Sequence, residues 1–227
     1  MSLFSVGKRL LNRYPSFLVA SSKAYNFIGF NKTRKKGKMN RVECNKSFLY
    51  KTKAKIIGSN NSIQIGNICQ LKNCTINIYG NNNRIIIGDN VYLKDAEFHI
   101  EDDYNEINIG NKTTIFGKTH FACIEGRKIV VGDDCMFSAD VVFRTGDSHS
   151  ITDNNGNRIN ASKDIIIGNH VWFGNRTIII KGVHIADNSI IGTGSVVTKA
   201  FFDVGVVLVG NPARIVKRNV NWLRERI

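Results

Sequence analysis

The sequence predicts an all-β solenoid, a triangular parallel β-helix, and three observations lead to this fold class. Aliphatic–glycine pairs recur every 22 residues, at Ile65-Gly66, Ile87-Gly88, Ile109-Gly110 and Val131-Gly132. From Ile167 onward, an aliphatic or aromatic residue recurs every six positions. The chain of 227 residues also contains 30 Ile and 27 Asn but only 2 Pro. Because Ile favours strands and Asn tolerates the left-handed backbone of tight corners, this composition fits a repetitive β-structure.

The six-residue period predicts which side chains point inward. Three such hexads make one triangular coil, and each coil buries its inner face only against its neighbours, so several coils are required. The 22-residue coils are interpreted as the same coil with a four-residue bulge at one corner, near Asn60-Asn61 and Asn81-Asn82-Asn83. The expected inward positions of the regular region are Ile167, Phe173, Ile179, Ile185, Ile191 and Val197.

One insertion interrupts the repeat, because the pairs at Val131-Gly132 and Ile167-Gly168 lie 36 residues apart. The inserted segment, residues 144–163, is expected to form a loop outside the prism. Loops on a rigid scaffold often carry function, and this one contains His149, preceded by Asp147 and Ser148. A histidine can act as a general base near neutral pH if a second group orients its ring. Asp147 either orients His149 or ends a turn.

The remaining histidines and the cysteines receive structural interpretations. Cys69 and Cys135 lie four residues after Ile65 and Val131, and they are expected to pack at a small inward position of the repeat. Twelve residues after Ile87, His99 is expected to point inward, whereas His120 precedes the inward Phe121 and should face outward. The histidine spacing offers no three converging ligands, so no metal site is expected. The five cysteines are odd in number and form no CxxC pair, which argues for a reducing compartment.

The charge is concentrated at the N-terminus. The chain has a formal charge of +14, and residues 1–42 contain ten Lys and Arg but no acidic residue. We expect a basic, helical segment over residues 1–40. It either contacts an anionic membrane peripherally or packs on the neighbouring domain with a solvated basic face. No apolar run is long enough to span a bilayer, and no basic platform interleaved with aromatic residues predicts nucleic-acid binding.

The chain is thus expected to have three parts. Residues 1–40 form the basic N-terminal segment, residues 41–205 form the β-helix with its loop at 144–163, and residues 206–227 form a C-terminal tail.

Three motifs carry a family resemblance. They are Val171-Trp172-Phe173-Gly174, the segment 194–199 and the segment 210–217. Together with the hexads and the histidine loop, they resemble the hexapeptide-repeat acyltransferases over about residues 40 to 218. The bulged early coils and the Asp-Ser-His loop are most similar to bacterial polysaccharide O-acetyltransferases. This resemblance implies a left-handed β-helix, a homotrimer with active sites between subunits, and acetyl-CoA as co-substrate.

The resemblance also assigns roles to individual residues. His149 matches the general base, and His120 and Asp147 fall near the acceptor, although the family has Asn where this chain has His120. Arg214 and Lys217 would bind the CoA phosphates through bidentate and point-charge contacts, respectively. Alternatively, Trp172 only covers a corner and the cationic residues are merely solvated. The candidate cofactor-binding residues are Trp172, Asn175, Thr193, Thr198, Lys199, Arg214 and Lys217.

The expected function is O-acetylation of a sugar or polysaccharide hydroxyl by direct transfer in a ternary complex. The enzyme would act in the cytoplasm or at the inner face of the membrane, on a carbohydrate acceptor. Two alternatives stay open: an N-acetyltransferase of an amino sugar or xenobiotic, and a non-catalytic solenoid that serves as a binding or scaffold protein.

Overall fold

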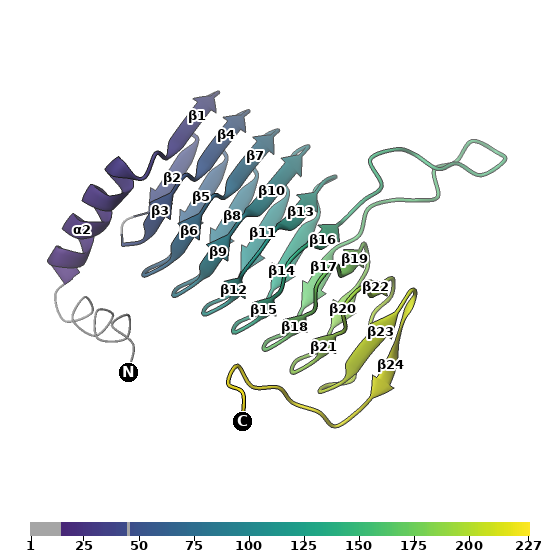
Figure 1. Ribbon diagram of the computed structural model, residues 1–227. Helices are drawn as coiled ribbons and strands as arrows, with labels where there is room; N and C mark the ends of the chain where they lie inside the picture. The colour runs from purple at the N-terminus through teal and green to yellow at the C-terminus, as the bar shows by residue number, and fades with distance from the viewer. Residues whose placement is uncertain (1–14, 45) are drawn as a thin grey trace.

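The computed structural model describes residues 15–44 and 46–227, and its body is a triangular prism of coiled parallel strands (Figure 1). Each coil contributes one strand to each of three sheets, called A, B and C here. The predicted left-handed parallel β-helix is therefore confirmed. Sheet A contains β1 (Lys32–Lys36), β4 (Lys53–Ile57), β7 (Thr75–Tyr79), β10 (Ala96–Glu101), β13 (Thr119–Cys123), β16 (Val141–Arg144), β19 (Ile178–Ile180) and β22 (Val196–Val197).

Sheets B and C complete the prism. In the three sheets that the structure describes, neighbouring strands run parallel, except that the last strand, β24, runs antiparallel to β23. Sheet B contains β2 (Arg41–Cys44), β5 (Ser62–Ile65), β8 (Arg84–Ile87), β11 (Glu106–Ile109), β14 (Lys128–Val131), β17 (Ile165–Ile167) and β20 (His184–Ile185). Sheet C contains β3 (Phe48–Tyr50), β6 (Gln70–Lys72), β9 (Tyr92–Lys94), β12 (Thr114–Ile115), β15 (Met136–Phe137), β18 (Trp172–Phe173), β21 (Ile190–Ile191), β23 (Val207–Gly210) and β24 (Ala213–Lys217).

The inside of the prism is filled by aliphatic residues and, in its middle coils, by stacked phenylalanines. Phe98 stacks on Phe121 with ring centroids 5.1 Å apart, and Phe121 stacks on Phe143 at 5.0 Å. Phe137 and Phe173 stack at 4.4 Å. All five rings are fully buried. Each coil thus buries its apolar face against the next, as the period predicts.

The cysteines are packed inside the same core. Cys69 and Cys135 occupy the small inward position that the repeat predicts, and both are fully buried. Burial raises the pKa of the Cys135 thiol to about 12, so this residue is unreactive near neutral pH. All five cysteines are free thiols.

The corners are held by ladders of Asn and Asp side chains. At the corner between sheets B and C, each side-chain oxygen accepts the backbone N–H of the residue one coil before it. Asn111 Oδ1 accepts from Asp89 N at 2.8 Å, and Asp133 Oδ1 accepts from Asn111 N at 2.7 Å. Amide and carboxylate alternate along this ladder, which separates the negative charges by two coils. The ladder comprises Asn67, Asp89, Asn111, Asp133, Asn169 and Asp187.

A glycine is required where neighbouring coils approach most closely. Gly58 has a φ of 125°, and a Cβ placed there would lie 1.8 Å from the carbonyl oxygen of Gly80. No other residue fits this position without moving the backbone of the next coil.

The helix α2 (Pro15–Ile28) covers the N-terminal end of the prism (Figure 1). Tyr25 packs edge-on against Phe48 of β3, with ring centroids 5.5 Å apart. The first strand, β1, already pairs with β4, so the coiled region begins ahead of residue 41. The segment before α2, residues 1–14, which makes up part of the expected basic segment 1–40, lies outside the described residues. Within the described part of the chain, no helix is long and apolar enough to cross a membrane.

His99 corrects one expectation. It was expected to point inward, but it lies on the outer face of sheet A, between the buried Phe98 and Ile100. The step from the inward Leu93 to the inward Phe98 is five residues, one fewer than the equivalent step from Ile115 to Phe121 in the next coil. The corner before β10 is therefore one residue shorter than the six-residue count assumes, and strand alternation then reverses the direction of the His99 side chain. His120, in contrast, faces outward beside the buried Phe121, as predicted.

Candidate active site

The insertion forms the long loop that leaves sheet A after β16 and returns at β17 (Figure 1). At its start, the backbone N–H of His149 donates to the carbonyl of Asp147 at 2.7 Å. Ser148, between them, has a φ of 63°. A three-residue turn with this bond and a positive φ is a strained form of the γ-turn. Such strain persists only where surrounding contacts enforce it, and it often marks a functional position.

Asn160 supplies those contacts. Its side chain is almost fully buried, and its Nδ2 donates both to Asp147 Oδ2 at 2.9 Å and to the carbonyl of His149 at 2.8 Å. Its Oδ1 accepts from Ile151 N at 2.8 Å and from Arg158 Nε at 3.1 Å. One amide side chain therefore fixes both ends of the His149 turn.

Lys181 anchors the same turn from the next coil. Its Nζ contacts Asp147 Oδ2 and donates to the carbonyl of Asn160 at 2.8 Å. The hydrogen bond from Lys181 is the main cause of a lowered pKa of Asp147, and Asn160 lowers it further. Asp147 is thus ionised and held by Lys181 and Asn160. The imidazole of His149 is exposed and has no hydrogen-bond partner within residues 15–44 and 46–227.

The loop is also tied to the preceding coil. Arg158 forms an ion pair with Glu125, with Nη2 and Oε1 2.6 Å apart, and Glu125 Oε2 accepts from Ser162 N at 3.3 Å. Arg158 is the main cause of a lowered pKa of Glu125. Gly146 allows close packing here, because a Cβ would lie 2.1 Å from Ser162 Oγ.

His120 lies on the outer face of sheet A, in the coil before the loop begins. Its Nδ1 lies 3.3 Å from Glu97 Oε2, and its ring stacks on His99 with centroids 6.3 Å apart. Burial lowers the pKa of His120 more than Glu97 raises it. His120 lies on the outer face of sheet A, one strand before β16, from which the loop with His149 departs.

Trp172 lies on a different face, pointing outward from sheet C. Its ring centroid is 6.1 Å from that of Trp222 in the C-terminal tail. Its Nε1 is buried and lacks a hydrogen-bond partner within the described residues. Trp172 therefore lies beside the C-terminal tail, and its buried indole N–H is available as a donor.

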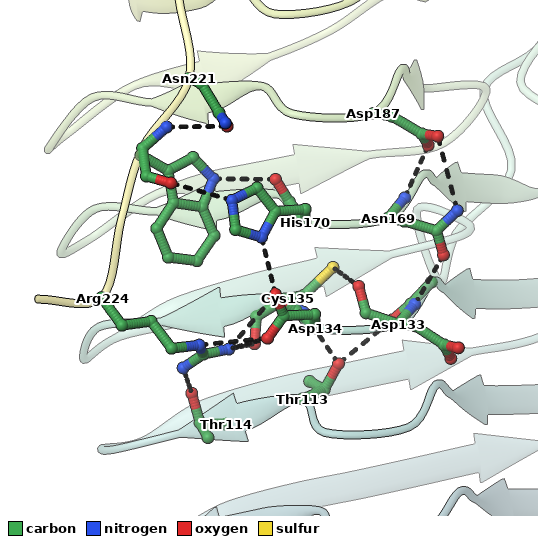
Figure 2. Close-up of polar contacts among 12 residues, drawn as sticks. Thr113, Thr114, Asp133, Asp134, Cys135, Asn169, His170, Asp187, Asn221 and Arg224 are labelled. Atoms are coloured by element: carbon green, nitrogen blue, oxygen red, sulfur yellow. Dashed lines mark hydrogen bonds and ion pairs between the residues drawn. The ribbon is translucent and has the colours of Figure 1, made fainter.

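The covering segment is a strap formed by residues 221–224, which crosses back over earlier coils. Trp222 stacks on His170 with ring centroids 4.0 Å apart, and its Nε1 donates to the His170 carbonyl at 2.8 Å. Figure 2 shows His170 directed at Asp134, at 2.7 Å, and Arg224 reaching Asp134 and Thr114. The strap is thus fixed at the corner between sheets B and C.

The candidate cofactor residues lie along the C-terminal coils. Asn175 and Thr193 occupy the corner between sheets C and A in successive coils, and both are exposed. Asn175 Oδ1 accepts from Ala139 N at 3.0 Å, so its oxygen already serves the coil ladder. Thr198 follows β22 at the next corner and is exposed.

The cationic candidates gather at the C-terminal end. Lys199 lines an open pocket of about 450 Å³ together with Phe201, Phe202, Asp203 and Ile215. Ile215 belongs to β24, whose exposed Arg214 and Lys217 lie on either side of it. None of these three cations pairs with a described carboxylate. The structure thus brings Lys199 close to β24.

Two parts of the candidate site are not brought together in one chain. His149 follows β16 of sheet A, whereas Trp172 belongs to β18 of sheet C. Sequence reasoning also missed Asn160, Lys181 and Trp222. These residues follow no repeat, so only their proximity in the folded chain reveals them.

Comparisons with known proteins agree with this architecture. The family described as "Bacterial transferase hexapeptide (six repeats)" matches residues 164–199. A polysialic acid O-acetyltransferase of Neisseria meningitidis is 36% identical over 175 residues, covering 77% of this chain and 80% of the relative. A galactoside O-acetyltransferase of Escherichia coli is 34% identical over 45% of this chain and 50% of the relative.

Solved structures show the same likeness over most of the chain. The crystal structure of the polysialic acid O-acetyltransferase OatWY has a TM-score of 0.81 and 36% identity, covering 86% of this chain and 92% of that one. The polySia-specific acetyltransferase NeuO also has a TM-score of 0.81, at 33% identity, covering 86% and 89%. The chain belongs to the hexapeptide-repeat acyltransferase family and is an acetyltransferase.

Proposed function

We propose that this protein transfers the acetyl group of acetyl-CoA to a hydroxyl of a polysaccharide, with His149 as general base. The observation that supports this role best is the geometry of the loop. A strained turn, fixed by Asn160 and Lys181, presents an exposed imidazole that contacts no described side chain. The similar relatives named as polysialic acid O-acetyltransferases support an acceptor of this class.

The chemistry follows from one proton transfer. A ring nitrogen of His149 removes the proton of the sugar hydroxyl as its oxygen attacks the thioester carbonyl carbon. The tetrahedral oxyanion collapses, the C–S bond breaks, and the CoA sulfur takes the proton back from the imidazolium. Both substrates are bound together, so no covalent enzyme intermediate is needed.

The C-terminal coils fit the co-substrate. Lys199, Arg214 and Lys217 carry three exposed, unpaired positive charges at one end of the prism, which suits the phosphates of CoA. Asn175 and Thr193 would lie along the pantetheine arm, Thr198 near the nucleotide, and Trp172 at the acetyl end.

We further propose a homotrimer, with each active site between two copies. Apolar residues point outward in register on two faces at the level of the loop. On sheet A this row comprises Val142, Ile178 and Val196, and on sheet C it comprises Met136, Trp172, Ile190 and Val207. Packing the row on sheet A of one copy, from β16 onward, on the row on sheet C of the next buries both rows and brings His149 towards the partner's Trp172. The outer face of sheet A before β16 stays outside this contact. Asp147 and His120 would then border the acceptor.

The experiment that tests this proposal is thiol release from acetyl-CoA with a panel of acidic and neutral glycans. We expect His149→Ala to abolish transfer while CoA still raises the melting temperature. Ser150→Ala, an exposed neighbour in the same loop, is the matched control and should keep wild-type turnover. Substantial turnover by His149→Ala would overturn the assignment. Preferential transfer to amino sugars would instead support N-acetylation.

A further inference from the structure

The first coils of sheet A present a row of cations that the proposed reaction does not use. Strand alternation directs Lys53 and Lys55 of β4 outward, because Ala54 and Ile56 between them are buried. In the parallel register, Lys32 lies beside Lys53 and Arg34 beside Lys55. Together with Lys36, these residues form what we call the basic face: Lys32, Arg34, Lys36, Lys53 and Lys55.

The positive charges of the basic face are not balanced by paired carboxylates among the described residues. All five side chains are exposed, and none forms an ion pair with a carboxylate in the described part of the chain. Like charges directly opposite each other on neighbouring strands destabilise a sheet. The pairs Lys32–Lys53 and Arg34–Lys55 therefore oppose folding, and an anionic ligand would relieve this repulsion.

The same face leads to the catalytic loop. From Lys55, the residues paired on successive strands of sheet A are Asn77, His99, Ala122 and Arg144. Arg144 is the last residue of β16, from which the loop departs. Four strand spacings of about 4.8 Å make this path roughly 19 Å long, which is longer than a disaccharide. The first carboxylates on it, Glu97 and Glu101, are each paired with a histidine.

The uncharged groups along this path suit a sugar chain. The ring of Tyr79 has Lys55 Nζ 5.1 Å from its centroid and His99 on its other side at 5.7 Å. Thr75 and Asn77 present a hydroxyl and an amide between the basic face and the histidines. A membrane surface would instead require apolar side chains among the cations. The exposed apolar residues nearest to the row lie beyond the two ends of β1 and not among its cations: Phe27, Ile28 and Phe30 precede the strand, and Met39 follows it.

We propose that the outer face of sheet A, from the basic face to Arg144, binds an extended anionic polysaccharide and delivers it to His149. This inference rests on the proposed function and deepens it, because it makes the acceptor a polymer with acidic groups. Several units of the chain contact the enzyme at once, so binding at the basic face retains the polymer between transfers.

The test separates polymer binding from catalysis. Full-length His149→Ala protein is titrated with α2,8-linked sialic acid oligomers of increasing length, with neutral dextran as a control ligand. We expect affinity to rise with oligomer length and to fall with added salt. Adding Lys53→Gln and Lys55→Gln should weaken binding of long oligomers about three- to tenfold, because each exposed charge pair contributes modestly.

The matched control removes the same charge from other faces, through Lys112→Gln and Lys128→Gln, and should bind as before. The melting temperature distinguishes lost binding from lost folding. Because the double substitution at Lys53 and Lys55 relieves like-charge repulsion, the melting temperature of this variant should equal or exceed that of the His149→Ala protein. Equal affinity of the two double variants would overturn the proposal. So would equal binding of dextran, or binding of phosphatidylglycerol vesicles without binding of the glycan.

Polymer binding at the basic face and acetyl transfer by His149 can be tested independently. In the catalytic background, Lys53→Gln with Lys55→Gln should keep turnover of short acceptors and lose turnover of long ones at low concentration. If no glycan is acetylated by the wild-type enzyme, the proposed function fails while the binding result still decides the role of this face.

Discussion

Equivalent corners of successive coils contain a residue in the left-handed backbone conformation, and at one of these corners that residue is Tyr104, whose side chain disfavours this conformation. Asn60, Asn82 and Tyr104 have φ values of 59°, 58° and 62°. Asn tolerates this conformation better than a bulky aromatic residue. The side chain of Tyr104 is 69% exposed, so it contributes little packing in return.

We therefore expect Tyr104→Asn to stabilise the protein by about 0.5–1 kcal/mol. Urea unfolding followed by circular dichroism measures this change as an increase in the midpoint at constant slope. Asn82→Tyr introduces the opposite change one coil earlier and should destabilise. A lower midpoint for Tyr104→Asn would show that the tyrosine ring makes contacts worth more than the backbone strain.

In the loop that carries the proposed general base His149, Lys181 contacts Asp147 and Asn160, so we propose that it positions the turn. We expect Lys181→Met to lower kcat about ten- to hundredfold, because small misplacements of a base have large effects. The KM for acetyl-CoA should change little, since the Lys181 ammonium contacts Asp147 and Asn160 and not a cofactor candidate. Lys181→Arg keeps the cation and should restore part of kcat.

Steady-state kinetics of both variants checks this prediction. Lys163→Met removes an exposed lysine at the foot of the same loop and serves as the control. If Lys181→Met raises KM and leaves kcat unchanged, Lys181 binds the acceptor and does not position the turn.

Single residues also show where the sequence was and was not informative. The periodic residues, such as Phe173 and Cys135, could be assigned to the core because the repeat fixes their direction. His149 could be found because an insertion in a regular solenoid must lie outside it. Asn160 and Lys181 could not be found, because their role depends on a loop that folds back without a repeat. His99 was misplaced because the corner before its strand is one residue shorter than the six-residue period assumes.

At the scale of elements, the strap joins the end of the chain to coils far earlier in the sequence. Arg224 donates to Asp134 Oδ1 at 2.9 Å and to Thr114 Oγ1 at 2.8 Å. Burial favours the protonated carboxyl of Asp134, but the hydrogen bonds from His170 and Arg224 outweigh burial and lower its pKa. The strap therefore depends on an ionised carboxylate.

This dependence sets the direction of a pH effect. Because the pKa of Asp134 is lower in the folded state than in the unfolded state, its ionised carboxylate stabilises the strap at pH values above the ordinary pKa of Asp. This stabilisation is lost as the pH falls through the lowered pKa of the folded state. We expect the strap to hold at pH 7 and to detach below about pH 4. Tryptophan fluorescence reports the separation of Trp222 from His170.

Asp134→Asn provides the comparison at constant pH, because it removes the charge and keeps the size. Its fluorescence at pH 7 should resemble that of the wild type at low pH. Wild-type fluorescence that stays constant down to the onset of global unfolding would show that stacking alone holds the strap.

At the scale of the whole molecule, the prism separates the groups that the proposed reaction would use. The loop with His149 emerges from sheet A, while Trp172 and the strap belong to sheet C and its corner with sheet B. A rigid solenoid cannot bend to join two of its faces, since each coil is fixed by its neighbours. A second copy is the simplest way to place one face opposite the other, and cyclic oligomers provide this head-to-tail contact.

This arrangement predicts complementation between two inactive variants. His149→Ala and Trp172→Ala should each lose transfer activity as pure proteins. After mixing, unfolding and refolding together, some sites combine the intact His149 of one copy with the intact Trp172 of the next. With random assembly, about a quarter of the sites are complete, so activity should recover to about a quarter of the wild-type value. Refolding each variant alone provides the background. If mixing restores nothing while each variant refolds and binds CoA, His149 and Trp172 do not act across an interface between copies.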